Sequence, residues 1–180
     1  IFLFYSCFFW GGGGGGEFYF HYISFSCIEM WLYTNISILG CYKHNGIQCG
    51  GGSFTGEVSS NFLKDVGCDY VILGHSERRN ANKESNLHVQ KCASSAINSN
   101  LIPIICVGET FKDRKNGTAL DYITKQVIES LPKSFENIII AYEPVWSIGT
   151  GKIPSKIEIK EMHEHIKNLI SLKYNKSIKV

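Results

Sequence analysis

Short apolar runs that recur from residue 46 onward most constrain the fold of this chain. The clearest cover residues 70–74, 101–107 and 138–142, and weaker candidates cover 46–49 and 177–180. Continuous apolar runs of this length are typical of strands buried on both faces of a parallel sheet. The expected starts near residues 46, 70, 101 and 138 lie 24, 31 and 37 residues apart, which is the spacing of βαβ units. The sequence therefore predicts an α/β fold with a parallel sheet.

The stretches between these runs predict helices, because apolar residues recur in them every three or four positions. Gly67 and Pro132 are expected to end two of the helices. Ser85 is expected to cap a third, and Ser155 with Glu158 forms a capping-box pattern ahead of the fourth. The apolar positions of the four helices are Val58, Phe62 and Val66; Leu87, Cys92 and Ala96; Leu120, Ile123, Val127 and Leu131; and Ile159, Met162, Ile166 and Leu169.

Composition divides the chain into two parts. Among 180 residues, Lys and Arg number 18 and Asp and Glu number 16, so the net charge of +2 gives no electrostatic footprint for nucleic acid. Residues 1–42 contain no Lys or Arg and include a glycine run at 11–16. We therefore expect residues 1–42 to be an atypical aromatic and glycine-rich segment without an assigned role, and residues 43–180 to form the folded domain.

The first residues carry no clear targeting signal. The apolar run at 1–10 is too short to span a bilayer, and it lacks the basic residues of a secretory or transit peptide. We therefore expect no membrane association and a cytoplasmic location, with a plastid or another organelle left open.

Two residues that can transfer protons follow different strands. His75 comes just after the run at 70–74, and Glu143 just after the run at 138–142. Because the carboxyl ends of parallel strands share one edge of a sheet, His75 and Glu143 are expected to meet there. A carboxylate base and an imidazole that polarises an oxygen suit proton transfer. The residues alone leave two alternatives open: a structural histidine, and an ordinary ion-pair cluster of Glu77 with Arg78 and Arg79.

The loop after Glu143 has the composition of a lid. Stiff residues stand at 144–146, and Gly149 and Gly151 stand near the other end. Such a loop can move as a unit on two short hinges, and its N–H groups can bind an anion.

Metal-ligand patterns are not evident, so we expect neither a metal nor a cofactor. The seven cysteines form no CxxC pair, and the sequence holds no HExxH. His163 and His165 stand two positions apart, which places them on different faces of a helix.

Two longer strings resemble a known family. Residues 70–79 read YVILGHSERR and residues 141–152 read AYEPVWSIGTGK, and both closely resemble the triosephosphate isomerases. Shorter matches are GSFTGE at 52–57, ICVGE at 105–109 and ITKQ at 123–126. The resemblance runs from about residue 46 to residue 180. It implies a (β/α)8 TIM barrel, of which this chain would hold about strands three to six and the start of strand seven.

The resemblance also implies an activity and the residues that carry it. Family members are homodimeric aldose–ketose isomerases that interconvert dihydroxyacetone phosphate and glyceraldehyde 3-phosphate without a cofactor. Glu143 would be the base and His75 the neutral electrophile, an established division of labour in this family, with Glu77 and Cys106 as supporting residues. The lid over the substrate phosphate would consist of Ile148, Gly149, Thr150, Gly151 and Lys152, and the residue that reaches into the partner subunit would be Thr55.

Some family features have no counterpart in this sequence. The Asn-x-Lys that follows the first strand of the family is not found before Lys43, and the Gly-Gly-Ser loop after strand seven and the glycine pair after strand eight are not found either. We therefore expect impaired activity, and low stability from open sheet edges. The alternatives are a non-catalytic barrel-fragment protein with a binding or assembly role, and another phosphate-binding (β/α)8 enzyme.

Overall fold

The computed structural model describes residues 38–40, 46–48 and 57–180, and these form a parallel sheet covered by helices. Four strands lie in the order β1 (Ile38–Gly40), β4 (Tyr70–Leu73), β5 (Ile102–Val107) and β6 (Ile139–Tyr142), and every pair is parallel. The predicted strand near the end of the sequence is present as a parallel bridge between Lys179 and Ile139. The Ile140 N–H donates to the Lys179 carbonyl at 3.0 Å, so this segment continues the sheet beyond β6.

Two short strands stand apart from this sheet. β2 (Gly46–Gln48) pairs in parallel with β3 (Glu57–Ser59). The strand predicted near residue 46 is thus present, but β1 rather than β2 lies beside β4. Spacing along the chain predicts where a strand forms; the choice of its partner depends on distant residues. β1 also lies within residues 1–42, to which the sequence assigned no structure.

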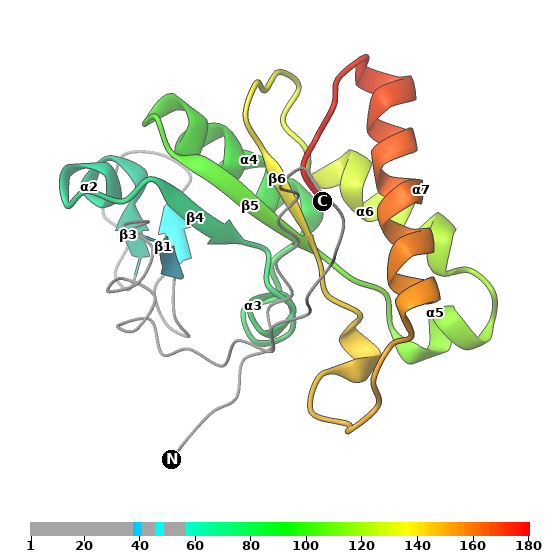
Figure 1. The fold of residues 1–180 in the computed structure, drawn as a ribbon. Helices are drawn as coiled ribbons and strands as arrows, with labels where there is room; N and C mark the ends of the chain where they lie inside the picture. Colours follow the sequence, from blue (N-terminus) through cyan, green and yellow to red (C-terminus); the bar gives the residue numbers. More distant parts are fainter. Residues whose placement is uncertain (1–37, 41–45, 49–56) are drawn as a thin grey trace, which may run out of the picture.

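Helices connect the strands and cover the sheet. They are α2 (Ser60–Asp65), α3 (Ser76–Ala81), α4 (Asn86–Asn98), α5 (Phe111–Lys115), α6 (Ala119–Ser130) and α7 (Lys156–Tyr174), with a 3₁₀ turn, η1, at Val145–Ser147. Figure 1 shows α4, α6 and α7 lying along the strands, while α3 and α5 lie at the end toward which β5 and β6 run. The predicted caps are confirmed: the Ser85 side chain accepts from His88 N–H, and Ser155 and Glu158 form a capping box.

The core lies between the four-stranded sheet and helices α4, α6 and α7. Val71 and Ile105 from the sheet and Ile123 and Ile166 from the helices are fully buried in it. Burying one such side chain stabilises the folded state by about 1.5–3 kcal/mol. The strands are therefore held firmly against the helices, and the loops at their carboxyl ends have a rigid base.

The first predicted helix differs from the structure. Val58 lies in β3, and Phe62 and Val66 are 58% and 57% exposed instead of facing the core. The buried apolar residue of α2 is Leu63. The buried Ser60 hydroxyl hydrogen-bonds to Ser95 of α4 and to Ser99 at the C-cap of α4, which fixes the rotation of this short helix. Leu87, predicted to face the core from α4, is likewise exposed.

Within the described residues, no helix is long and apolar enough to cross a membrane.

Candidate active site

His75 and Glu143 meet at the carboxyl edge of the sheet. His75 caps α3 two residues after β4, and Glu143 follows β6 directly. The His75 Nε2 lies 3.0 Å from Glu143 Oε2, and the two side chains are 18% and 12% exposed. The strands bring together residues 68 positions apart in the sequence, as their shared position after strand ends predicted.

The Glu143 carboxylate is held from two sides. Its Oε1 accepts the backbone N–H of Ser76 at 2.6 Å, at the start of α3, and its Oε2 faces His75. Its own backbone N–H donates to the Val107 carbonyl of β5 at 2.8 Å. Gly108 makes this approach possible, because a Cβ there would lie 1.8 Å from the Glu143 carbonyl oxygen. A side chain at position 108 would therefore displace Glu143.

The hydrogen bonds of the His75 ring fit one tautomer. Its Nδ1 accepts the backbone N–H of Glu77 at 3.4 Å, which leaves the proton of the neutral ring on Nε2, facing Glu143. Burial of the ring lowers its pKa, but the hydrogen bond to Glu143 and the charges of Glu143 and Glu77 outweigh it, so the pKa of His75 is raised above its ordinary value. In this ligand-free arrangement Glu143 therefore favours protonation of the ring.

The two residues predicted to support the pair lie beside it. Glu77 occupies the first turn of α3, where its side chain is exposed. Cys106 is buried in β5, directly before Val107, whose carbonyl accepts the Glu143 N–H. Glu77 thus lies in the helix that His75 caps, and Cys106 lies one residue before the strand contact of Glu143.

The predicted lid residues form an exposed loop after η1. Gly149 and Gly151 have φ angles of +69° and +73°, which glycine adopts without strain. The Thr150 hydroxyl donates to the Trp146 carbonyl at 2.8 Å and so folds the loop back on η1. The Lys152 ammonium lies 3.7 Å from the centre of the exposed Phe111 ring of α5. The loop is thus attached at both ends and exposed between them.

A buried carboxylate, Glu109, holds the first end of this loop, and sequence reasoning did not single it out. Its Oε1 accepts from the Tyr142 hydroxyl at 3.0 Å and from Trp146 Nε1 at 2.8 Å. Arg114 Nε lies 3.2 Å from the same oxygen as an ion pair without hydrogen-bond alignment, and Arg114 Nη2 donates to the Tyr142 hydroxyl. We call these four residues the Glu109 cluster.

A usable signal for Glu109 was present in the sequence. It stands two residues after β5, just as His75 stands two residues after β4, so the same rule of strand ends selects it. Burial, together with the charge of Glu109, raises the pKa of Tyr142 far above its ordinary value. Tyr142 therefore stays a neutral hydroxyl and keeps donating to the carboxylate.

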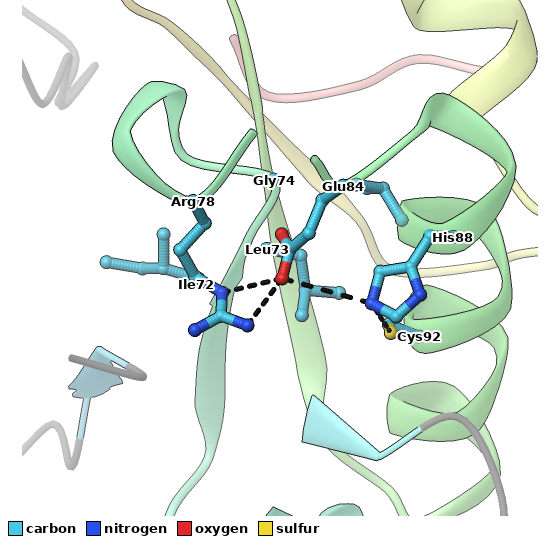
Figure 2. Close-up of a pocket in the computed structure, with 8 residues that line it drawn as sticks. Ile72, Leu73, Gly74, Arg78, Glu84, His88 and Cys92 are labelled. Carbon is cyan, nitrogen blue, oxygen red and sulfur yellow. Dashed lines mark hydrogen bonds and ion pairs between the residues drawn. The ribbon is translucent and has the colours of Figure 1, made fainter. Parts of the chain in front are cut away.

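A small cavity beside β4 is separate from this site. Figure 2 shows Glu84 between Arg78 and His88 in its wall, with Arg78 Nη2 2.5 Å and His88 Nε2 3.9 Å from Glu84 Oε1. Neither His75 nor Glu143 lines the cavity. The Arg78–Glu84 ion pair joins α3 to the segment before α4, which is a structural role.

Two further predictions concern a metal and a partner subunit. In the part of the chain that the structure describes, no group of His, Cys, Asp and Glu side chains could hold a metal ion. Thr55, predicted to reach into a partner subunit, lies outside the described residues.

Known proteins named triosephosphate isomerase are similar to this chain. The family model described as triosephosphate isomerase matches residues 32–180. The triosephosphate isomerase of Alkaliphilus oremlandii is 44% identical over 131 residues, which cover 71% of this chain and 53% of that protein. That of Dictyoglomus thermophilum is 46% identical over 131 residues with the same coverage. The chain spans about half the length of these curated relatives.

A solved structure agrees with the sequence matches. The triosephosphate isomerase of Bartonella henselae superposes with a TM-score of 0.65 at 37% identity, covering 74% of this chain and 55% of that one. The parallel sheet with alternating helices is therefore part of a (β/α)8 barrel, as predicted. The family match begins at residue 32, earlier than the expected start near residue 46, and so includes β1. This chain belongs to the triosephosphate isomerase family.

Proposed function

We propose that this chain carries the proton-transfer centre of a triosephosphate isomerase, which interconverts dihydroxyacetone phosphate and D-glyceraldehyde 3-phosphate. The observation that carries the proposal is the 3.0 Å contact between His75 Nε2 and Glu143 Oε2 at neighbouring strand ends. A base and an acid placed together in this way suit the transfer of a proton between adjacent carbons.

Glu143 acts as the base in this proposal. Its carboxylate removes a proton from the carbon next to the substrate carbonyl, and the electron pair left behind forms an enediolate. The same carboxyl group then returns the proton to the neighbouring carbon. The hydroxyl proton on the oxygen of the first carbon passes through His75 to the former carbonyl oxygen, so atoms and charge balance without an external oxidant or reductant. The hydrogen bond from Ser76 N–H to Oε1 supports this role, because it orients the carboxylate while Oε2 faces the site.

His75 acts on the substrate oxygen. Its Nε2–H donates a hydrogen bond to the carbonyl oxygen, where negative charge develops as the enediolate forms. The raised pKa of His75 depends on the contact with Glu143. When substrate draws the carboxylate away from the ring, burial remains as the dominant influence, and burial favours the neutral imidazole that donates from Nε2.

The loop at 148–152 covers the substrate phosphate. Its exposure, its two glycines with positive φ and the Lys152 side chain support this role. Closing such a lid excludes water while the enediolate exists, and backbone N–H groups and a cation favour an anionic group beneath it.

The test uses the whole chain and dihydroxyacetone phosphate in D2O. We expect proton NMR to show glyceraldehyde 3-phosphate with deuterium at carbon 2, because the base exchanges its proton with solvent. The Glu143→Gln variant, which keeps the acceptor for Ser76 N–H, should form deuterated product about 10³-fold more slowly. Substrate binding without product would instead support the non-catalytic alternative and overturn the proposed activity.

We also propose that the protein assembles as a homodimer, as the family resemblance implies. Sedimentation equilibrium should then give twice the chain mass of 20.2 kDa. Thr55→Arg should shift this value toward one chain mass, whereas a monomer without substitution would contradict the proposal.

A further inference from the structure

Arg79 of α3 reaches back to the ends of two strands. Its Nε donates to the Gly74 carbonyl, just after β4, at 2.6 Å, and its Nη2 donates to the Cys106 carbonyl of β5 at 3.2 Å. Its Nη1 donates to Asn86 Oδ1 of α4 at 2.7 Å, and Nη2 also donates to the Ser130 hydroxyl of α6 at 3.3 Å. One planar guanidinium thus joins two strand ends and two helices.

The backbone at Gly74 is shaped around this guanidinium. Gly74 has a φ of +65°, and a Cβ there would lie 2.8 Å from both Arg79 Nη2 and a methyl carbon of Val89. Only glycine gives the turn this conformation and leaves room for the arginine. The residue that follows this turn is His75, so its place depends on where Arg79 holds the strand end.

Arg79 contacts the end of β4, which precedes His75, and β5, which lies beside the strand that precedes Glu143. His75 follows β4, Glu143 follows β6, and β5 lies between these strands in the sheet. The Glu143 N–H donates to the Val107 carbonyl of β5, and Arg79 joins the neighbouring Cys106 carbonyl to the residue before His75. Three hydrogen bonds, joined by the chain between Val107 and Cys106 and between Gly74 and His75, therefore connect the backbone of Glu143 to that of His75.

We propose that Arg79 is a positioning residue that holds His75 at its distance from Glu143 across β5. The inference rests on the proposed isomerase function and deepens it. Arg79 acts through backbone carbonyls and does not touch the reacting atoms. The guanidinium suits this role because it presents several N–H donors in one rigid plane, whereas a lysine ammonium cannot reproduce that geometry.

The charge of Arg79 is consistent with this role. Burial lowers the pKa of Arg79, and the charge of Glu143 is among the influences that oppose this effect. An arginine remains protonated at neutral pH, so all its N–H donors stay available to the two strand ends.

The experiment measures kcat and KM of the Arg79→Lys variant of the whole chain with dihydroxyacetone phosphate. Lysine keeps the positive charge but loses the planar fork. We expect kcat to fall about 10- to 100-fold, since a displacement of about 1 Å between reacting groups costs up to about 10²-fold. KM should change less than about threefold, because Arg79 has no contact with the lid residues and the loss falls on the chemical step.

Arg78→Lys is the matched control. Arg78 is the neighbouring residue of α3. Arg78 is buried and Arg79 is half-buried, and the Arg78 guanidinium pairs with Glu84 at the cavity of Figure 2. This variant loses the same planar fork from the same helix. We expect lower thermal stability and a kcat within about twofold of the unsubstituted protein.

A second measurement does not depend on turnover. In substrate-free ¹⁵N-labelled protein, the imidazole NMR signals of His75 report its contact with Glu143. They should shift in Arg79→Lys and stay in place in Arg78→Lys. If Arg79→Lys does not fold, Asn86→Ala, which removes the acceptor of Nη1, is measured in the same ways and should show smaller shifts of the same kind.

Each outcome decides one claim. A lower kcat with nearly constant KM, together with shifted His75 signals, supports the role of Arg79. Lower stability with unchanged His75 signals in Arg79→Lys would mean that Arg79 is merely structural and would overturn the inference. If the unsubstituted protein shows no turnover, the proposed function fails, while the His75 spectra still decide whether Arg79 positions the ring.

Discussion

Two carboxylates follow adjacent strands of one sheet, yet their surroundings differ sharply. Glu109, after β5, is fully buried, and Tyr142, Trp146 and Arg114 crowd around a single oxygen of its carboxylate. Glu143, after β6, keeps 12% of its side chain exposed, and each of its two oxygens has one partner. The first carboxylate is fixed in place, and the second retains room to move toward a substrate.

This difference shows that position after a strand end selects candidate residues but does not assign their roles. Glu109 cannot leave its partners without leaving buried donors unpaired, which is costly. Glu143 can exchange its contact with His75 for a contact with a ligand. The surrounding donors, supplied by distant parts of the chain, therefore separate a structural carboxylate from a proposed catalytic one.

Replacing the proposed base should have the largest effect. In Glu143→Gln the amide keeps an acceptor for Ser76 N–H, so the fold should be preserved, but the base is lost. We expect kcat to fall by about 10³-fold, within the range of general acid–base catalysis. Steady-state kinetics measure this loss, and a melting temperature close to that of the unsubstituted protein shows that the fold is intact. Activity retained within about tenfold would contradict the role of Glu143.

Replacing the buried carboxylate should instead affect stability. Glu109→Ala leaves the Tyr142 hydroxyl, the indole N–H of Trp146 and the Arg114 charge without their acceptor. We expect the free energy of unfolding, measured by urea titration, to fall by about 3 kcal/mol. The exposed Glu161 of α7 offers a matched control, for which Glu161→Ala should change it by less than about 0.5 kcal/mol. Equal effects of the two substitutions would remove the contrast between Glu109 and an ordinary surface glutamate.

The pH dependence should reflect the His75–Glu143 contact and not the Glu109 cluster. The pKa of His75 in the folded state is raised above 6.5. The contact of protonated His75 with Glu143 therefore stabilises the fold fully at pH values below the pKa of the unfolded state. This stabilisation is lost as the pH rises through the pKa of the folded state. Catalysis needs the neutral ring, so kcat/KM should fall about tenfold per pH unit below the raised pKa.

The raised pKa of His75 should depend on the Glu143 carboxylate. NMR titration of His75 should give a lower pKa in Glu143→Gln, because the main influences that raise it are removed. A His75 pKa that is unchanged by this substitution would show that Glu143 does not control the ring.

The smallest expected effect comes from the hydrogen bond between Trp146 and Glu109, which holds η1 directly before the lid. Trp146→Phe removes the 2.8 Å hydrogen bond to Glu109 and keeps most of the ring. A typical hydrogen bond contributes about 1 kcal/mol, so the ligand-free lid arrangement should be weakened about fivefold. We expect KM to fall by about this factor, and Trp146→Phe kinetics with unchanged KM would show that the bond does not restrain the lid.

Apolar runs and helix caps within residues 70–180 predicted much of the fold. The runs at 70–74, 101–107 and 138–142 correspond to β4, β5 and β6, and Ser85 and Ser155 cap α4 and α7 as expected. These features are local, because a strand or a cap depends on a few consecutive residues. The stripe of Val58, Phe62 and Val66 was misleading, since a six-residue helix takes its rotation from what it packs against.

The candidate site likewise has a part that local sequence predicts and a part that depends on distant segments. The strings around His75 and Glu143 indicated both residues, and their place after parallel strands predicted that they would meet. The partners of Glu109 and the four acceptors of Arg79 could not be predicted, because they come from segments up to 51 residues apart. No local pattern encodes a hydrogen bond across such a separation.

The sequence by itself determined the α/β pattern and the family, and it indicated the two residues proposed for proton transfer, because these depend on short stretches with strong local preferences. Tertiary structure alone decided that β1 lies beside β4, that Glu109 is locked while Glu143 is not, and that Arg79 joins the ends of β4 and β5. The physical reason is that burial and hydrogen bonding depend on which distant segments pack together. Those contacts give identical side-chain chemistry different energies and different roles.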